Sequence, residues 1–358
     1  MNNLAGLRST DAGALFNSAL RSATAIVTAW TFVFLPTLVR AQAAGDRSDP
    51  GVDADDARTQ ALLGTYNLAT PEPYGNLYAT APGAGAQASR AQFRVNVIAP
   101  INFDSNVEEV SSAGARSWGT FPSGNVSWAA PAADLPLRIT ASVNSEFRRF
   151  SDAPNADVNR LTISGRLQYV DPTNDQAFSP YFAVTPRFSY LPAFSEQTEA
   201  RQDFNFGFNK RFNFNGALEP VAIGPNTSTE TVWSFGLTAF VQRRLRQPQL
   251  SSSAVALVPS ISWLISKDWN ANFAVEFLGR WYDADLLGRT SRDWEALPIA
   301  TLEYVIPASL FGGGNRADLL GRPAVDFQVS HLKVWSSVLG AGFYQWEASA
   351  ALKMGWRF

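Results

Sequence analysis

The chain has a single histidine, His331, which directly follows Ser330. A serine beside a histidine suggests a hydrolase, because the imidazole can act as general base for the serine hydroxyl. Adjacent residues on a β-strand point to opposite faces, so these two side chains do not meet unless a bulge intervenes. The chain has no second histidine, no cysteine and no Gly-x-Ser-x-Gly motif. We therefore predict no catalytic residue and a structural role for His331.

Acidic and glycine-rich stretches also offer little chemistry. Asp53, Asp55, Asp56 and the pair Glu108–Glu109 lack the ligand spacing and central glycine of an EF-hand. The run Gly312–Gly314 has no following Lys-Ser/Thr, so it predicts a turn and not a phosphate-binding loop. The formal net charge of -2 gives no excess of positive charge of the kind that binds nucleic acid. We expect no metal, no cofactor and no nucleic-acid partner.

A larger set of charged residues shares one pattern. Each lies on the polar side of a segment in which apolar and polar residues alternate. The set comprises Arg94, Arg138, Arg148, Arg166, Arg187, Arg211, Arg280, Glu146, Glu276, Glu303 and Glu347, with Asp203 and Asp326 in the same pattern. Arginine and carboxylate side chains on one face can pair across neighbouring strands, or they can line a path that selects solutes by charge.

The elements that carry these residues are β-strands, because a period of two places alternate side chains on opposite faces. We expect strands at residues 93–103, 124–130, 135–147, 161–169, 182–190, 204–214, 233–241, 255–265, 273–281, 294–306, 325–334 and 344–358. In the eleventh segment the apolar positions change phase between Val329 and Leu332, which predicts a β-bulge. The connections at 131–134, 171–176 and 267–270 are short, whereas 215–230 and 307–323 are long. A count of ten or fourteen strands therefore stays open.

The last segment is the most regular. Tyr344, Trp346, Trp356 and the terminal Phe358 share one face with other apolar residues, while small, polar or charged residues form the other face. A strand of this length can cross a bilayer with tilt, and its aromatic residues are typical of membrane–water interfaces. This segment resembles the C-terminal strand of bacterial outer-membrane β-barrel proteins, the porin-like superfamily. The resemblance implies a lipid-facing surface and recognition of Phe358 by the barrel-assembly machinery.

The N-terminal region predicts export. Residues 22–39 carry no charge, follow Arg8 and Arg21, and precede the small-residue pattern Ala41-Gln42-Ala43. These features are those of a secretory signal peptide, which we expect at residues 1–43 with cleavage after Ala43. The alternative is a single membrane anchor. Residues 44–90 are rich in Ala, Gly, Pro and Asp and predict a flexible periplasmic lead-in.

Together these features predict an all-β protein: a transmembrane antiparallel up-and-down β-barrel of about twelve strands over residues 91–358, in the bacterial outer membrane. A soluble β-sandwich also alternates, but it would turn its apolar face inward. We expect a narrow channel for passage or export of hydrophilic solutes through a charged lumen, with membrane lipid as partner. The alternative is a non-conducting structural, adhesion or assembly barrel that acts through its extracellular loops, chiefly between Asp104 and Pro122. A lipid hydrolase using His331 is a third, weaker hypothesis.

Overall fold

The computed structural model describes residues 91–107, 114–132, 135–171, 174, 176–221, 231–247, 249–284, 288–339 and 341–358. The predicted signal peptide, the predicted lead-in and the acidic residues Asp53, Asp55, Asp56, Glu108 and Glu109 lie outside this part of the chain. Within it, no helix is both long and apolar enough to cross a membrane.

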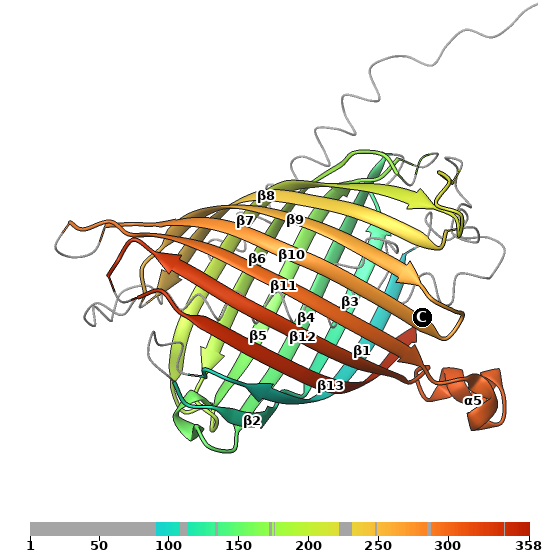
Figure 1. The fold of residues 1–358 in the computed structure, drawn as a ribbon, viewed down its shortest axis with the longest axis horizontal. Coiled ribbons are helices and arrows are strands. Elements are labelled where there is room, and N and C mark those ends of the chain that lie inside the picture. The colour runs from blue at the N-terminus through green and yellow to red at the C-terminus, as the bar shows by residue number, and fades with distance from the viewer. Residues whose placement is uncertain are drawn as a thin grey trace, which may run out of the picture. The chain divides into compact units, whose positions relative to one another are not determined.

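The described chain folds into antiparallel strands that follow one another around a single sheet (Figure 1). The strands are β1 (Gln92–Asp104), β2 (Ser117–Thr120), β3 (Ser123–Pro131), β4 (Leu137–Phe150), β5 (Val158–Tyr169), β6 (Ser179–Tyr190), β7 (Gln197–Phe214), β8 (Trp233–Gln247), β9 (Ser252–Leu264), β10 (Trp269–Tyr282), β11 (Arg292–Val305), β12 (Ala324–Ser336) and β13 (Tyr344–Arg357). Short helices occur at η2 (Pro154–Ala156), η4 (Ala308–Phe311) and α5 (Gly314–Leu319).

The sheet closes on itself. Strand β13 pairs with β1 from Arg94↔Arg357 to Asp104↔Glu347, and Phe93 and Phe358 exchange backbone hydrogen bonds of 3.1 and 2.8 Å. The last strand of the predicted barrel therefore closes it against the first. Closure leaves no unpaired sheet edge, which is the condition for a β-structure within lipid.

Strands β2 and β3 act as one strand of the barrel. Both pair with β1 on one side and with β4 on the other, in one continuous register. The ladder is interrupted at Phe121 and Pro122, because proline has no N–H to donate to a neighbouring strand. The barrel thus has twelve positions around its wall, and the predicted up-and-down barrel of about twelve strands is confirmed.

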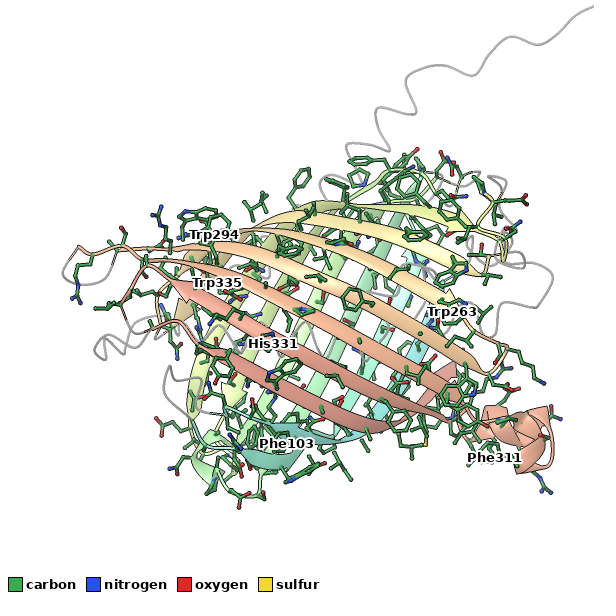
Figure 2. The ribbon with its side chains drawn as sticks, viewed as in Figure 1. Phe103, Trp263, Trp294, Phe311, His331 and Trp335 are labelled. Atoms are coloured by element: carbon green, nitrogen blue, oxygen red, sulfur yellow. The ribbon has the colours of Figure 1, made fainter. Side chains whose placement is uncertain are left out.

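The apolar face of the barrel points outward and the polar face inward. Large apolar side chains such as Ile101, Phe206 and Trp294 are exposed at 62%, 62% and 54%, whereas their polar neighbours along each strand are buried or half-buried. A soluble barrel would reverse this arrangement, because water would then contact the outer surface. Figure 2 shows Trp294 and Trp335 near one end of the barrel and Trp263 near the other. Aromatic side chains thus occur near both ends of the apolar surface, as at two membrane interfaces.

Two details of the prediction are wrong. Strand β12 has no bulge: its pairing with β11 and β13 keeps one register throughout, and Leu332 and Val334 point into the barrel at 0% and 1% exposure. The segment between Asp104 and Pro122 is not entirely a loop, because β2 extends the second strand back to Ser117. The bulge was predicted because apolar residues also occur on the inner face of β12. The short strand β2 was missed because Pro122 interrupts the strand pairing.

The connections separate into two sets, one at each end of the barrel. The connections that follow β3, β5, β7, β9 and β11 start at the end where β1 begins and β13 ends, which we call the terminal end. The connections that follow β1, β4, β6, β8, β10 and β12 start at the opposite end, which we call the loop end. The long segment 306–323 contains η4 and α5, so it is a folded excursion and not an additional strand.

Candidate functional site

All of the charged residues predicted to line a lumen lie on the inward face of their strands. Those that are buried are Arg148, Arg187, Arg280, Glu146, Glu276, Glu303 and Glu347, and those that are half-buried are Arg94, Arg138, Arg166 and Arg211. The structure therefore gathers these residues in the interior of the barrel, where burial makes their pairing important for stability.

The first interior group centres on Glu199 of β7. Its Oε2 lies 2.9 Å from Arg187 Nη2 on β6, and its Oε1 lies 2.5 Å from Arg246 Nε on β8. The Ser189 hydroxyl donates a third bond of 3.0 Å to Glu199 Oε2. One carboxylate thus holds two guanidinium groups from the strands on either side of it.

Asp203, two inward positions further along β7, repeats this arrangement. Arg244 of β8 donates to both of its carboxylate oxygens, at 2.8 and 3.1 Å, and Arg201 Nε donates to Oδ2 at 2.9 Å. Bidentate guanidinium–carboxylate pairs of this kind are strong and fix the orientation of both groups. The interior side of β6, β7 and β8 is therefore held by a ladder of buried charges near the loop end.

Neighbouring strands extend the arginine-rich surface. Arg148 Nε donates to Glu146 Oε1 at 2.5 Å, and Arg160 Nη1 lies 3.5 Å from the same oxygen. Further along β5, the guanidinium of Arg166 stacks 3.8 Å from the ring centroid of Tyr181 on β6. The ring face carries partial negative charge and attracts the cation without neutralising it.

The opposite side of the barrel has the reverse composition. Lys353 of β13 lies between two carboxylates, with its Nζ 2.5 Å from Glu303 Oε2 and 2.8 Å from Asp326 Oδ2. Asp326 is 0% exposed and Lys353 is 2% exposed. On β10 and β11, Arg280 Nε lies 3.6 Å from Glu295 Oε1. Here a few cations are surrounded by carboxylates.

The described interior is therefore sorted by charge into two walls. The arginine wall, β4 to β8, carries inward Arg138, Arg148, Arg160, Arg166, Arg187, Arg201, Arg211, Arg244 and Arg246 against Glu146, Glu199 and Asp203. The acidic wall, β10 to β13, carries inward Glu276, Asp293, Glu295, Glu303, Asp326 and Glu347 against Arg280 and Lys353. In a closed barrel of twelve positions, β6 and β7 lie half-way round from β12 and β13, so the two walls face each other.

Two uncharged stripes separate the walls. On β9 the inward residues are small or apolar: Ser252, Ala254, Ala256, Val258, Ser260 and Ser262. On β3 they are Ser123, Asn125, Ser127 and Ala129. The two stripes lie half-way round the barrel from each other, as the walls do. The charge pattern thus has two opposed faces of opposite sign, separated on one side by β9 and on the other by β3 together with β1, whose inward charged residues are Arg94 and Asp104.

The interior also contains an apolar cluster. Leu297, Ile299, Leu332, Val334 and Phe343 pack together on β11 and β12 and in the segment before β13, each at most 3% exposed. They lie towards the loop end of the acidic wall. Burial of this apolar surface stabilises that part of the barrel, and it narrows the space that water can occupy.

Several interior residues were missed by the sequence analysis. Glu199, Arg201, Arg244 and Arg246 lie on parts of β7 and β8 that extend beyond the predicted strands at 204–214 and 233–241. There the outward residues include Gln202 and Arg243, so the alternation of apolar and polar residues fades. A signal was still present, because the charged residues keep the period of two that the apolar residues lose.

The remaining predicted residues lie as follows. Ser330 is buried inside the barrel, whereas His331 points outward with its ring 4.3 Å from that of Trp346. The two side chains thus lie on opposite faces of β12. On the outer surface, Tyr344, Trp346 and Phe358 are exposed at 58%, 51% and 74%, and Trp356 is half-buried.

No protein-family model and no curated protein matches the sequence. Among solved structures, the chain is similar to an outer-membrane channel of Pseudomonas putida F1, at 10% identity over 75% of this chain and 96% of that one, with a TM-score of 0.45. The translocator domain of the autotransporter NalP from Neisseria meningitidis has 10% identity, coverage of 88% and 100%, and a TM-score of 0.40. The β-domain of the Bordetella autotransporter BrkA has 6% identity, coverage of 74% and 99%, and a TM-score of 0.38.

The location of the barrel follows from its own surface. Its strands form a closed antiparallel wall, its outward face is apolar with aromatic residues near both ends, and its inward face is polar and charged. Only closed barrels and helices satisfy every backbone hydrogen bond within lipid, and barrels of this pattern are those of bacterial outer membranes. The chain is therefore an outer-membrane β-barrel.

Proposed function

We propose that the barrel is a narrow channel through which small hydrophilic solutes cross the outer membrane. The observation that carries this proposal is the sorting of the interior charges into an arginine wall and an acidic wall. Opposed walls of opposite sign create a field across the lumen, which orients solutes that carry separated charges. The proposal assigns no reaction to the barrel.

An interior that side chains merely fill does not require charges of one sign to gather on one side of the barrel. Side chains that only occupy space are most stable when each buried charge has a partner of opposite sign, because an uncompensated buried charge is costly. The arginine wall has three times as many arginines as carboxylates, so its own carboxylates do not match its arginines one to one. Placing like charges side by side raises the energy of the folded state. A function that uses the field supplies a reason for this cost.

Planar-bilayer recordings on the purified protein test the proposal. We expect discrete conductance steps that are small for a twelve-stranded barrel, because most of the interior charged groups are buried. Under a salt gradient we expect a measurable reversal potential. A complete lack of discrete conductance, with the protein shown to be folded and inserted, would overturn the channel.

One observation favours a second candidate, a non-conducting barrel that acts through its loop-end segments. The buried apolar cluster around Leu332 and Phe343 occupies the interior near the loop end, and no polar solute gains by contact with it. Leu332→Ser distinguishes the two functions. In a channel this substitution widens the polar path and raises conductance, whereas in a non-conducting barrel the bilayer still shows no conductance.

Recognition by the barrel-assembly machinery through Phe358 is part of the proposal. Phe358 is 74% exposed and its backbone closes the barrel against Phe93, so its ring is accessible while its position is fixed. We expect Phe358→Ala to lower the amount of barrel assembled in cells while leaving refolding in detergent unchanged. Equal assembly of both forms in cells would exclude this role.

A further inference from the structure

The excursion between β11 and β12 has a feature that transport through the barrel does not use. Residues 306–323 leave the wall at the terminal end and fold into η4 and α5, which Figure 1 shows beside the end of the barrel. Three of its leucines are strongly exposed: Leu310 at 72%, Leu319 at 77% and Leu320 at 44%. Exposed leucines gathered on one short segment usually mark a contact surface.

The excursion is fixed to the outer, lipid-facing side of the wall. Trp356 belongs to the outward face of β13, and its Nε1 donates a 3.0 Å hydrogen bond to the carbonyl of Leu319. Gly355 N donates a 2.7 Å bond to the carbonyl of Gly321. Gly321 has φ of +72°, and a Cβ there would lie 2.7 Å from the Trp356 ring. The chain therefore passes directly over an outward aromatic side chain.

This attachment gives the leucines a defined neighbour. The outward face of β13 continues to Phe358, which is 74% exposed and lies at the lipid-facing surface. Leu319, whose carbonyl accepts the hydrogen bond from the outward Trp356, thus lies beside the surface that contacts lipid. The excursion also carries Arg316 and Arg322, of which Arg322 pairs with Asp318, whereas Arg316 is exposed. Apolar side chains beside an exposed arginine suit the boundary between acyl chains and phosphate headgroups.

We propose that residues 306–323 form an interfacial foot, which rests in the headgroup region of the leaflet at the terminal end and inserts Leu310 and Leu319 among the acyl chains. The occupant of this surface is phospholipid. Arg316 lies where it can contact the phosphates of that leaflet. Such a foot fixes the depth and tilt of the barrel in the membrane, because short amphipathic segments bind in the interfacial plane.

The lack of cysteine in the chain makes a direct test simple. Single cysteines at Leu310 and Leu319 are spin-labelled, and the protein is reconstituted into vesicles of phosphatidylethanolamine and phosphatidylglycerol. Collision with dissolved oxygen, which concentrates in lipid, is compared with collision with a water-soluble nickel complex. A cysteine at Ala217, an exposed residue of another terminal-end segment, is the control. We expect a severalfold higher oxygen-to-nickel ratio at both leucine positions than at Ala217.

A glycine variant tests the attachment. Gly321→Ala introduces a Cβ against Trp356 and should move residues 306–323 away from the outward face of β13. The oxygen-to-nickel ratio at position 319 should then fall towards that of the control. Gly288→Ala is the matched variant, because Gly288 also has positive φ, of +74°, but a Cβ there meets nothing within 4 Å. It should leave the ratio unchanged. Nickel accessibility at Leu310 and Leu319 equal to that at Ala217 would overturn the foot, and so would an unchanged ratio in Gly321→Ala.

Discussion

The two interior walls of the barrel are built from the same fold and differ in chemistry. The arginine wall, β4 to β8, is held together by carboxylates that each bind two arginines, as Glu199 does with Arg187 and Arg246. The acidic wall, β10 to β13, reverses this order, because Lys353 binds both Glu303 and Asp326. In each wall the less frequent charge, which we call the minority charge, bridges residues of the more frequent sign, the majority charge.

This difference separates two roles that interior charges can have. The minority groups reduce repulsion between like charges, so they mainly support the fold. The majority groups outnumber the opposite charges of their own wall, so we expect them mainly to set the field. Removing a bridging residue should therefore cost stability first, whereas removing a majority residue should alter the ion selectivity of the proposed channel first.

The largest effect is expected at the bridge of the acidic wall. Lys353→Met leaves Glu303 and Asp326 buried close together without their shared cation, which should destabilise the barrel by about 3–5 kcal/mol. Urea unfolding followed by the gel mobility of the folded barrel measures the change. Lys333→Met is the control: Lys333 points outward with its Nζ 5.6 Å from the Tyr344 ring centroid, so its loss should cost no more than about 1 kcal/mol. Equal stability of the two variants would contradict the bridging role.

The bridge of the arginine wall should give a smaller loss. Glu199→Gln removes the charge that Arg187 and Arg246 share but keeps a hydrogen-bonding group in place, so we expect about 2–3 kcal/mol. The same unfolding assay applies. Glu196→Gln in the neighbouring turn is exposed and should change stability by less than about 0.5 kcal/mol. If Glu199→Gln matched this control, the ladder on β6 to β8 would contribute nothing to stability.

Majority charges should instead shift the reversal potential, and in opposite directions on the two walls. Arg166→Gln removes a cation that stacks on the Tyr181 ring, so it should make the proposed channel less selective for anions. Glu276→Gln on the acidic wall should make it more selective for anions. Ser127→Ala, on the neutral stripe of β3, should cause no shift. Shifts of the same sign in both charge variants would show that the walls do not act as opposed surfaces.

The smallest effect is expected outside the lumen, where the walls are joined across β9. Arg243 projects outward from β8, and its two Nη atoms lie 2.8 and 2.6 Å from the carboxylate oxygens of Asp283, which follows β10. The hydrogen bond from Arg243 holds the pKa of the Asp283 carboxyl below its usual value. A depressed pKa means that the pair stabilises the fold above about pH 4 and loses this contribution as the pH falls through the folded-state pKa.

Both groups of this pair are well exposed, so its contribution should stay within about 1 kcal/mol and weaken with salt. Asp283→Asn should lower the unfolding temperature slightly at pH 7 and not at all at pH 2. Thermal unfolding of both forms at the two pH values measures this. A larger difference at pH 2 than at pH 7 would reverse the assigned sign.

Much of the fold could be predicted because lipid imposes a simple rule. A wall one strand thick must alternate between lipid and lumen, so the period of two predicted most of the strands and their two faces. The prediction was wrong where apolar residues serve the interior. Leu332 and Val334 keep strict alternation, but their chemistry is that of the outer face, so the sequence alone suggested a bulge.

The sorting of interior charges into two walls could have been predicted from the sequence, but the sequence analysis did not predict it. The inward arginines gather in the third to seventh strands and the carboxylates in the ninth to twelfth, which the order of residues already contains. The sorting was overlooked because several of the charged residues lie at the ends of strands. Glu199 and Arg246 lie where strands extend past the apolar band, and a search for alternating hydrophobic residues stops there. Which group pairs with which depends on register between strands, and a single sequence leaves this undetermined.

The neutral stripes on β9 and β3 have a consequence for the handedness of solutes. Between them and the two charged walls, the lumen presents four different quadrants in a fixed order around its axis. A molecule aligned by its positive and negative groups still has two lateral sides, and one must face β9 while the other faces β3. Mirror-image molecules exchange those sides. We therefore expect the proposed channel to pass the two enantiomers of a zwitterion at different rates.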